Sequence, residues 1–246
     1  MSRPFLTARW ESLLLLNYDC PPELLEPLVP AGTTLDRWQG RTLVSLVGFR
    51  FADTRVRGIP IPYHRTFEEV NLRFYVRRSA PDGNVRRAVV FIRELVPRWA
   101  IATVARLVYN EPYLAVPMEH QVSLTSSTGG AVRYAWRHAG ISYSMSASVA
   151  GPAQPLARGS EAEFITEHYW GYTRQRDGTT LEYRVDHPPW AVWEIPDATL
   201  HGRTDWLYGP EFGRLLARPP ASAFLAVGSE VSVYPGQRLQ PEVSSS

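Results

Sequence analysis

Residues 67–113 constrain the fold most, because they predict a β-hairpin that is followed at once by a helix. Residues 67–78 alternate between apolar and polar side chains, which is typical of a strand with two unlike faces. Residues 88–96 are apolar on both faces except at one Arg-Glu pair, so we expect an interior strand covered on both sides. The turn Pro81-Asp82-Gly83-Asn84 joins the two strands, and Asp-Gly is a strong hairpin signal.

The register of this hairpin decides which side chains share a face. If Asp-Gly forms a two-residue loop, Asn71 faces Glu94. Arg73 is then the diagonal neighbour of Glu94 on the same face. The apolar face would combine Val70, Leu72, Phe74 and Val76 with Val89, Phe91 and Leu95. A slip of one residue would put Arg93 in place of Glu94 on the polar face, so we predict the first register and leave the second open.

The polar face of the hairpin has two readings, which concern Glu69, Asn71, Arg73 and Glu94. It is either a solvated outer face, as in many antiparallel sheets, or the polar lining of a cavity inside a barrel. A charge in such a cavity needs a partner, because leaving it unpaired is energetically costly. An ion pair between Arg73 and Glu94 would meet this need and would still offer planar guanidinium donors to a carboxylate ligand.

The cavity reading also names candidate site residues. Glu69 and Glu94 are the candidate catalytic pair, since a buried wall would raise the pKa of one carboxyl into the range of acid–base work. Asn71 and Arg73, with Arg93 in the alternative register, are candidate ligand-binding residues, because arginine holds a carboxylate or an enolate in place.

A helix is predicted directly after the hairpin. Ile101, Val104, Ala105 and Val108 follow the helical spacing, Pro97 suits the first turn, and Pro112 ends the segment. Tyr113 then lies at the helix exit and is a further candidate ligand contact. His168 and His187 flank another predicted hairpin; a structural role is the more common outcome for both, and we include His187 in the ligand-binding set.

The rest of the chain is predicted to be mainly antiparallel β-structure. Strand patterns cover residues 5–18, 41–51, 121–126, 131–137, 141–150, 169–176, 179–186 and 222–234. Short helices are expected after Pro21, after the capping box at Ser160 and from Gly209. Four serines alternate along 141–150, either on a solvent face or as a small-residue lining. We therefore expect an α+β protein in which antiparallel strands predominate, as one domain over residues 1–246.

Composition excludes several classes of function. The formal net charge is +2 and the arginines are scattered, so nucleic acid is not an expected partner. The single cysteine, Cys20, cannot form an internal disulfide, which fits a reducing cytoplasm. No signal-peptide pattern and no long apolar run is present, so we expect no membrane association. The spacing of His, Cys, Asp and Glu predicts no metal, and no motif predicts a cofactor.

Several segments together resemble a known family. They are PPELLEPLVPAGTTLD, FEEVNLRFYVRR, FIRELVPRWAIATVARLVYNEPY, EFITEHYWGYT, DHPPW and VGSEVSVYPGQRL, and they occur in order over nearly the whole chain. This series is similar to the YqjF-type family, also called DUF2071, which is grouped with the acetoacetate-decarboxylase-like fold. The resemblance implies a β-barrel or cone around a small-molecule cavity, with a few short peripheral helices. Phe74 departs from the threonine that is expected after Asn-Leu-Arg.

The 246-residue chain contains no lysine. All 26 residues counted as lysine or arginine are arginine. The decarboxylase of that superfamily works through a lysine iminium flanked by arginine and glutamate, as the resemblance implies. This chain has no side-chain amine with which to form a Schiff base. Likeness of fold alone therefore predicts no reaction.

Two hypotheses of function remain. The first is a small-molecule-binding protein or a non-decarboxylating enzyme, in which Arg73 anchors a carboxylic acid and Glu69 or Glu94 acts as base. The second is a binding or structural module with a filled core and no turnover. A homo-oligomer is compatible with either.

Overall fold

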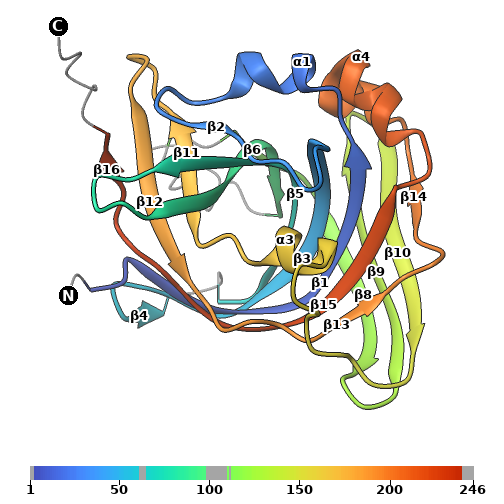
Figure 1. Cartoon of the computed structure of the whole chain (residues 1–246). Helices are drawn as coiled ribbons and strands as arrows, with labels where there is room; N and C mark the ends of the chain where they lie inside the picture. Colours follow the sequence, from blue (N-terminus) through green and yellow to red (C-terminus); the bar gives the residue numbers. More distant parts are fainter. Residues whose placement is uncertain (1–2, 61–64, 98–109, 111, 240–246) are drawn as a thin grey trace, which may run out of the picture.

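A long, curved β-sheet forms the body of the protein (Figure 1). The computed structural model describes residues 3–60, 65–97, 110 and 112–239. The spatial order of the strands is β13 (Val192–Glu194), β15 (Ser222–Val233), β1 (Leu6–Asp19), β3 (Leu43–Val56), β5 (Phe67–Ser79), β6 (Val85–Val96), β11 (Trp170–Arg174), β12 (Thr180–Asp186) and β16 (Gln237–Arg238). Strand β12 also pairs with β15 over two residues, so the sheet curves round on itself as a cone.

Three short strands extend this sheet. They are β2 (Thr34–Leu35) on β5, β4 (Ile59–Pro60) on β3 and β7 (Tyr113–Ala115) on β6. Within the described residues, the pairings of β6 with β7 and with β11 are parallel and the others are antiparallel. The predicted predominance of antiparallel strands is therefore confirmed.

A smaller sheet packs against one face of the long sheet. Its order is β14 (Thr199–His201), β10 (Ile141–Ala150), β9 (Gly129–His138) and β8 (Met118–Thr125). The contact is close at Gly48 in β3, where a Cβ would lie 2.8 Å from Met145 and from Tyr134. Gly48 thus lets the two backbones approach, as a glycine inside a strand often does.

The helices are short, as predicted. They are α1 (Pro22–Leu25), η1 (Glu26–Leu28), α3 (Glu161–Thr166) and α4 (Thr204–Leu216). Ser160 caps α3 by accepting a hydrogen bond from the Glu163 amide at 3.1 Å, which confirms the predicted helix start. The Glu163 carboxylate accepts from the Gly159 amide at 2.6 Å, and not from the Ser160 amide as in a full capping box. The helix predicted from Gly209 is confirmed as the second part of α4, because Gly209, with a φ of 82°, is non-helical and divides Thr204–Leu216 into two helical parts. The first part, which begins at Thr204, was not predicted. The helix predicted after Pro97 falls on residues outside the described ones.

The long sheet has two buried faces. The face that we call the small-sheet face packs against the smaller sheet and α4, through side chains such as Leu14, Leu46 and Leu72. The opposite face, which we call the α3 face, packs against α3 and Trp190. Because strand side chains alternate, each long strand contributes to both cores.

The β5–β6 hairpin confirms the predicted pairing of Asn71 with Glu94 but not the predicted loop. Ala80 donates a backbone hydrogen bond to Asn84 at 2.9 Å, so the loop is one residue longer than expected. A register shift between Leu72 and Arg73 compensates for it. Leu72 still faces Arg93, as the predicted register requires, but beyond the bulge Arg73 faces Phe91, so the predicted placing of Val89 and Phe91 with Phe74 is wrong. Ala88 and Val90 occupy that face instead.

Candidate functional site

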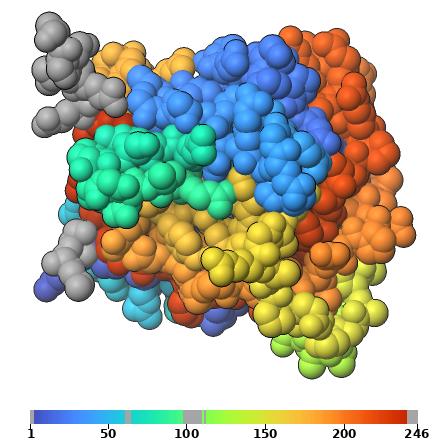
Figure 2. Space-filling view, in the orientation of Figure 1, coloured from blue at the N-terminus to red at the C-terminus, as the bar shows by residue number. Residues whose placement is uncertain are grey.

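The polar row of β5 and β6 is buried on the α3 face. Glu69, Asn71 and Glu94 are 3%, 2% and 1% exposed, so the reading as a solvated outer face is wrong for these residues. Helix α3 packs over the Arg73 end of the row, where the Ile165 carbonyl accepts a hydrogen bond from Arg73. Figure 2 shows that the segment around α3, coloured yellow to gold, lies at the molecular surface.

Glu69 is held by two hydrogen bonds at the end of the row. The Asn71 amide donates to Oε1 at 2.9 Å, and the Tyr113 hydroxyl donates to Oε2 at 3.3 Å. Burial raises the pKa of Glu69 to about 7, because desolvation of the carboxylate outweighs both hydrogen bonds and the charge of Arg73. A carboxyl with such a pKa exchanges its proton near neutral pH, which is what a general acid or base needs.

Arg73 is the electrostatic centre of the site. Its positive charge opposes the rise in the pKa of Glu69, and it helps, after burial, to lower the pKa values of His168 and His187. The guanidinium donates to the Ile165 carbonyl at 3.3 Å and lies 5.7 Å from the centre of the Tyr75 ring. Its Nε is buried and has no hydrogen-bond partner.

The predicted ion pair between Arg73 and Glu94 is not formed. The bulge at Leu72 places Arg73 opposite Phe91, one step away from the Asn71–Glu94 pair. Arg73 makes no ion pair with any other residue that the structure describes. Guanidinium donors therefore remain available on this face, as the cavity reading requires.

His168 joins the site, although a structural role was the prediction for it. Its ring packs on Tyr75 at 4.6 Å and meets Phe164 edge-on at 5.3 Å. Nε2 lies 3.5 Å from Asp36, too far for a well-formed hydrogen bond, and both ring nitrogens are buried without a partner. Burial lowers the pKa of His168 to about 4, so the ring is neutral at pH 7. No local pattern signals this, because Asp36, directly after β2, and Tyr75, in β5, are far from His168 in the sequence.

A buried chain of hydrogen bonds holds Tyr75 in place. The Ser45 hydroxyl gives its one proton to Asn17 Oδ1 at 2.6 Å, so the Tyr75 hydroxyl must donate to Ser45, also at 2.6 Å. Asn17 donates to Ser222 at 3.1 Å, and Ser222 donates to Glu161 of α3 at 2.6 Å. The chain thus fixes the ring on which both Arg73 and His168 lie.

The remaining predicted site residues lie in different places. Glu94 and Tyr113 share the α3 face and pair across β6 and β7. Arg93 lies on the small-sheet face, where its charge acts on Tyr208, so it is not part of this site. His187 stacks on Trp190 at 4.1 Å and approaches Tyr169 at 4.8 Å. Burial lowers the pKa of His187, and its Nδ1 is bonded to the Pro188 carbonyl at 2.9 Å.

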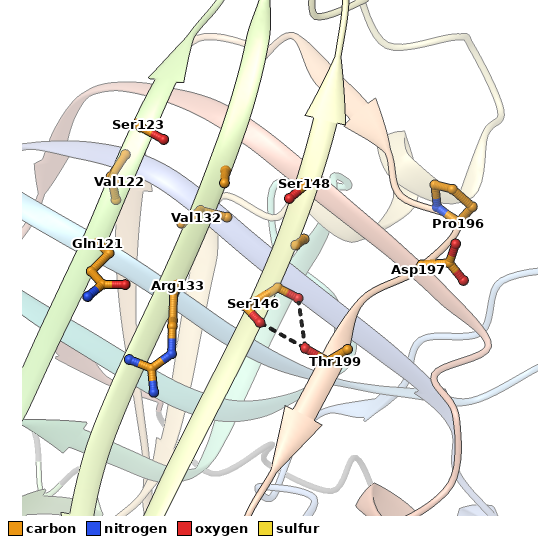
Figure 3. A pocket seen from close by; sticks show the side chains of 12 residues that line it. Gln121, Val122, Ser123, Val132, Arg133, Ser146, Ser148, Pro196, Asp197 and Thr199 are labelled. Atoms are coloured by element: carbon orange, nitrogen blue, oxygen red, sulfur yellow. Dashed lines mark hydrogen bonds between the residues drawn. The ribbon is translucent and has the colours of Figure 1, made fainter.

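A separate groove of about 790 Å³ lies on the outer side of the smaller sheet (Figure 3). Ser146 and Ser148 of β10 line it, and the Ser146 hydroxyl shares a hydrogen bond with Thr199 at 2.8 Å. Ser144 of the same strand is buried and Ser142 is exposed. Both interpretations of the serine row therefore apply to part of it: Ser142 faces solvent, and Ser146 and Ser148 line a groove.

Two structural features are absent from the described residues. No group of three His, Cys, Asp or Glu side chains in this part of the chain could hold a metal ion. No helix among the same residues is long and apolar enough to cross a membrane.

Comparison of the fold with solved structures defines its class. Acetoacetate decarboxylase from Legionella pneumophila has a TM-score of 0.65 at 14% identity, covering 99% of this chain and 90% of that chain. An acetoacetate decarboxylase-like enzyme from Sphingomonas wittichii RW1 has a TM-score of 0.64 at 13% identity, covering 96% and 92%. The enduracididine biosynthesis enzyme MppR, complexed with pyruvate, has a TM-score of 0.66 at 12% identity, covering 98% and 92%. The chain has the acetoacetate-decarboxylase-like fold.

The sequence comparison is more specific. The family model DUF2071, described as an uncharacterized conserved protein, matches residues 7–230, so the chain belongs to the DUF2071 family. It is 26% identical over 189 residues to the uncharacterized protein YqjF of Bacillus subtilis (strain 168), covering 74% of this chain and 73% of that protein. The resemblance drawn from the sequence motifs is confirmed.

Proposed function

We propose that this protein binds a small organic acid on the α3 face of its long sheet, and that Glu69 exchanges a proton with the bound acid. One observation carries the proposal: the partly buried guanidinium of Arg73, whose Nε is buried without a hydrogen-bond partner, has no carboxylate partner among the described residues, and its charge acts on a glutamate whose pKa is raised to about 7. A ligand carboxylate would supply the missing charge.

The arrangement suggests a role for each residue. Arg73 holds the carboxylate, and the neutral His168 beside it offers a ring N–H to the same ligand. Glu69 and Arg73 are four residues apart on β5, so their Cα atoms are about 13 Å apart, a spacing that suits a ligand of a few carbon atoms. Asn71 lies between them, and its Oδ1 is buried without a partner.

The chemistry would be acid–base chemistry next to a carbonyl. Removal of a proton from the carbon beside a carbonyl gives an enolate, which Arg73 and Asn71 would stabilise. Glu69 is the proton acceptor, and Glu94, opposite Asn71, is the second carboxyl of the predicted catalytic pair. An imine route has no lysine available. The pyruvate bound in the similarly folded MppR supports a small 2-oxo acid as the first ligand to try.

Thermal-shift measurements with pyruvate, acetoacetate and lactate test the binding step. At a ligand concentration of 100 times the dissociation constant, we expect about 2.7 kcal/mol of added stability, or a shift of about 5–10 °C. Arg73→Ala should abolish the shift. Arg93→Ala is the matched control, because Arg93 lies on the opposite face of the same hairpin. If no acid raises the melting temperature of wild type, or if an acid raises that of wild type and Arg73→Ala equally, Arg73 does not bind the carboxylate.

Exchange of the pyruvate methyl protons in deuterated water, followed by NMR, tests the proton transfer. We expect wild type to accelerate the exchange and Glu69→Gln to lose this effect while still binding the acid. Binding without any exchange in wild type would leave the second hypothesis, a binding module without turnover. The cytoplasmic location and the single domain over residues 1–246 stay predictions from the sequence.

A further inference from the structure

Strand β8 forms one end of the smaller sheet, and no described strand pairs with its outer edge. Among the described residues, β8 pairs with β9 alone, in an unbroken register from Met118–Trp136 to Thr125–Gly129. Residues 121–123 are exposed on both faces of the strand. The unpaired N–H and C=O groups of such an edge are a template for another strand.

The edge lacks the features that usually prevent strand addition. Proteins protect exposed edges with prolines, positive charges or bulges. The sequence of β8 is MEHQVSLT, which holds no proline, no arginine and a single glutamate, and its pairing with β9 shows no bulge. The strand therefore meets the requirements for pairing along its other side.

Apolar burial also stops abruptly at this edge. Val122, Val132 and Ala147 form one cross-strand row on the inner side of the smaller sheet. Val132 is 1% exposed and Ala147 is 7% exposed, whereas Val122 is 39% exposed. A further strand beside β8 would complete the row by covering Val122.

The outer side of the same edge is polar and carries small side chains. The row Ser123, Ala131 and Ser148 forms part of the groove of Figure 3, and Gln121 and Arg133 form the neighbouring row. Because both rows reach β8, the groove is open toward the free edge. A strand added there needs a polar outer side and an apolar inner side, which is the pattern of β8 itself.

We propose that a second copy of this chain pairs its β8 antiparallel with β8, which joins the two smaller sheets across a two-fold axis at Val122. In this register Val122 meets the partner's Val122, Gln121 meets the partner's Ser123, and Glu119 meets the partner's Thr125. Polar residues then oppose polar residues on the outer side and valine opposes valine on the inner side. The two grooves become one trough that crosses the axis.

Charge disfavours one alternative register, with the axis at Glu119. Glu119 and its copy are six positions apart along the joined strands, or about 20 Å. An axis at Glu119 would set the two carboxylates roughly 5 Å apart, and like charges directly opposite destabilise a strand pair. Pairing of eight-residue edges makes an interface at the small end of the usual range, so we expect a dimer that dissociates on dilution.

Cysteine cross-linking of the full chain tests the geometry. Cys20 is the one native cysteine and is 4% exposed, so an introduced thiol is a clean reporter. Directly opposed residues have Cα atoms about 4.5–5.5 Å apart, within the range of a disulfide, so Val122→Cys should give a covalent dimer under mild oxidation. Ser148→Cys, on β10, would lie about 24 Å from its copy and should not cross-link. Equal cross-linking of both variants, or none of Val122→Cys, overturns the proposal.

Sedimentation velocity tests the equilibrium. We expect wild type to pass from monomer to dimer between about 1 µM and 1 mM. Val122→Asp, which places two carboxylates at the axis, should weaken the dimer at least tenfold, whereas Val122→Thr should leave it intact. Circular dichroism melts check that the variants fold. A wild type that stays monomeric throughout, or an oligomer that Val122→Asp leaves unchanged, overturns the proposal independently of any ligand on the α3 face.

Discussion

Replacing Glu69 by glutamine measures how strongly the α3 face excludes water. The pKa of Glu69 is raised from 4.5 to about 7 by burial. A carboxyl whose pKa is raised in the folded state stabilises that state only while protonated. Its contribution is therefore complete below about pH 4.5 and is lost as the pH rises through about 7.

The size of this effect follows from the shift. A change of about 2.5 pKa units corresponds to roughly 3.4 kcal/mol of folding free energy, since each unit is worth 1.36 kcal/mol. Glutamine keeps an oxygen for the Asn71 amide and never ionises. Glu69→Gln and wild type should thus be about equally stable near pH 4.5, and the variant should be about 3 kcal/mol more stable near pH 8.

Only the difference between the two proteins isolates this group, because His168 acts in the opposite direction. The pKa of His168 is lowered from 6.5 to about 4, so its contribution is present above about pH 6.5 and is lost as the pH falls through about 4. The two effects oppose each other between pH 4 and 7, and the stability of wild type should change little there. Urea unfolding of both proteins over this range supplies the difference.

A surface substitution provides the control. Glu119 is exposed, so Glu119→Gln should change stability by less than about 0.5 kcal/mol across the range. If the difference between Glu69→Gln and wild type is flat with pH, the carboxyl at Glu69 is solvated and the reasoning about the site is wrong.

Three further substitutions test the packing around the site. Ser45→Ala leaves two buried hydrogen-bond partners unsatisfied and should cost about 2–4 kcal/mol in urea unfolding. His168→Phe should remove the opposing effect of His168, so the variant should gain stability as the pH falls from 6.5 to 4, whereas a variant as flat as wild type would place the titrating group elsewhere. Gly228→Ala should cost clearly more than Gly58→Ala, by thermal melts: both have positive φ, but a Cβ at Gly228 would lie 2.0 Å from the Trp10 carbonyl, whereas Gly58 faces open space.

The sequence alone determined the secondary structure of the site and its polar composition. The alternation along residues 67–78 predicted β5, and Asp-Gly predicted a hairpin that pairs Asn71 with Glu94. These features depend on residues close together in the chain, which is why a local pattern reveals them. The missing lysine, which excludes an imine, is likewise a property of the sequence itself.

The tertiary structure decided which polar residues share the site and how they ionise. The bulge at Leu72 moved Arg73 one step further from Glu94, and the pairing of Asn71 with Glu94 excluded the alternative register that would have put Arg93 on the polar face. Helix α3, almost a hundred residues further along the chain, buried the row and brought His168 against Tyr75. Burial and pKa depend on the groups that pack around a side chain from distant parts of the chain, and alternation within one strand cannot distinguish a solvated face from a covered one.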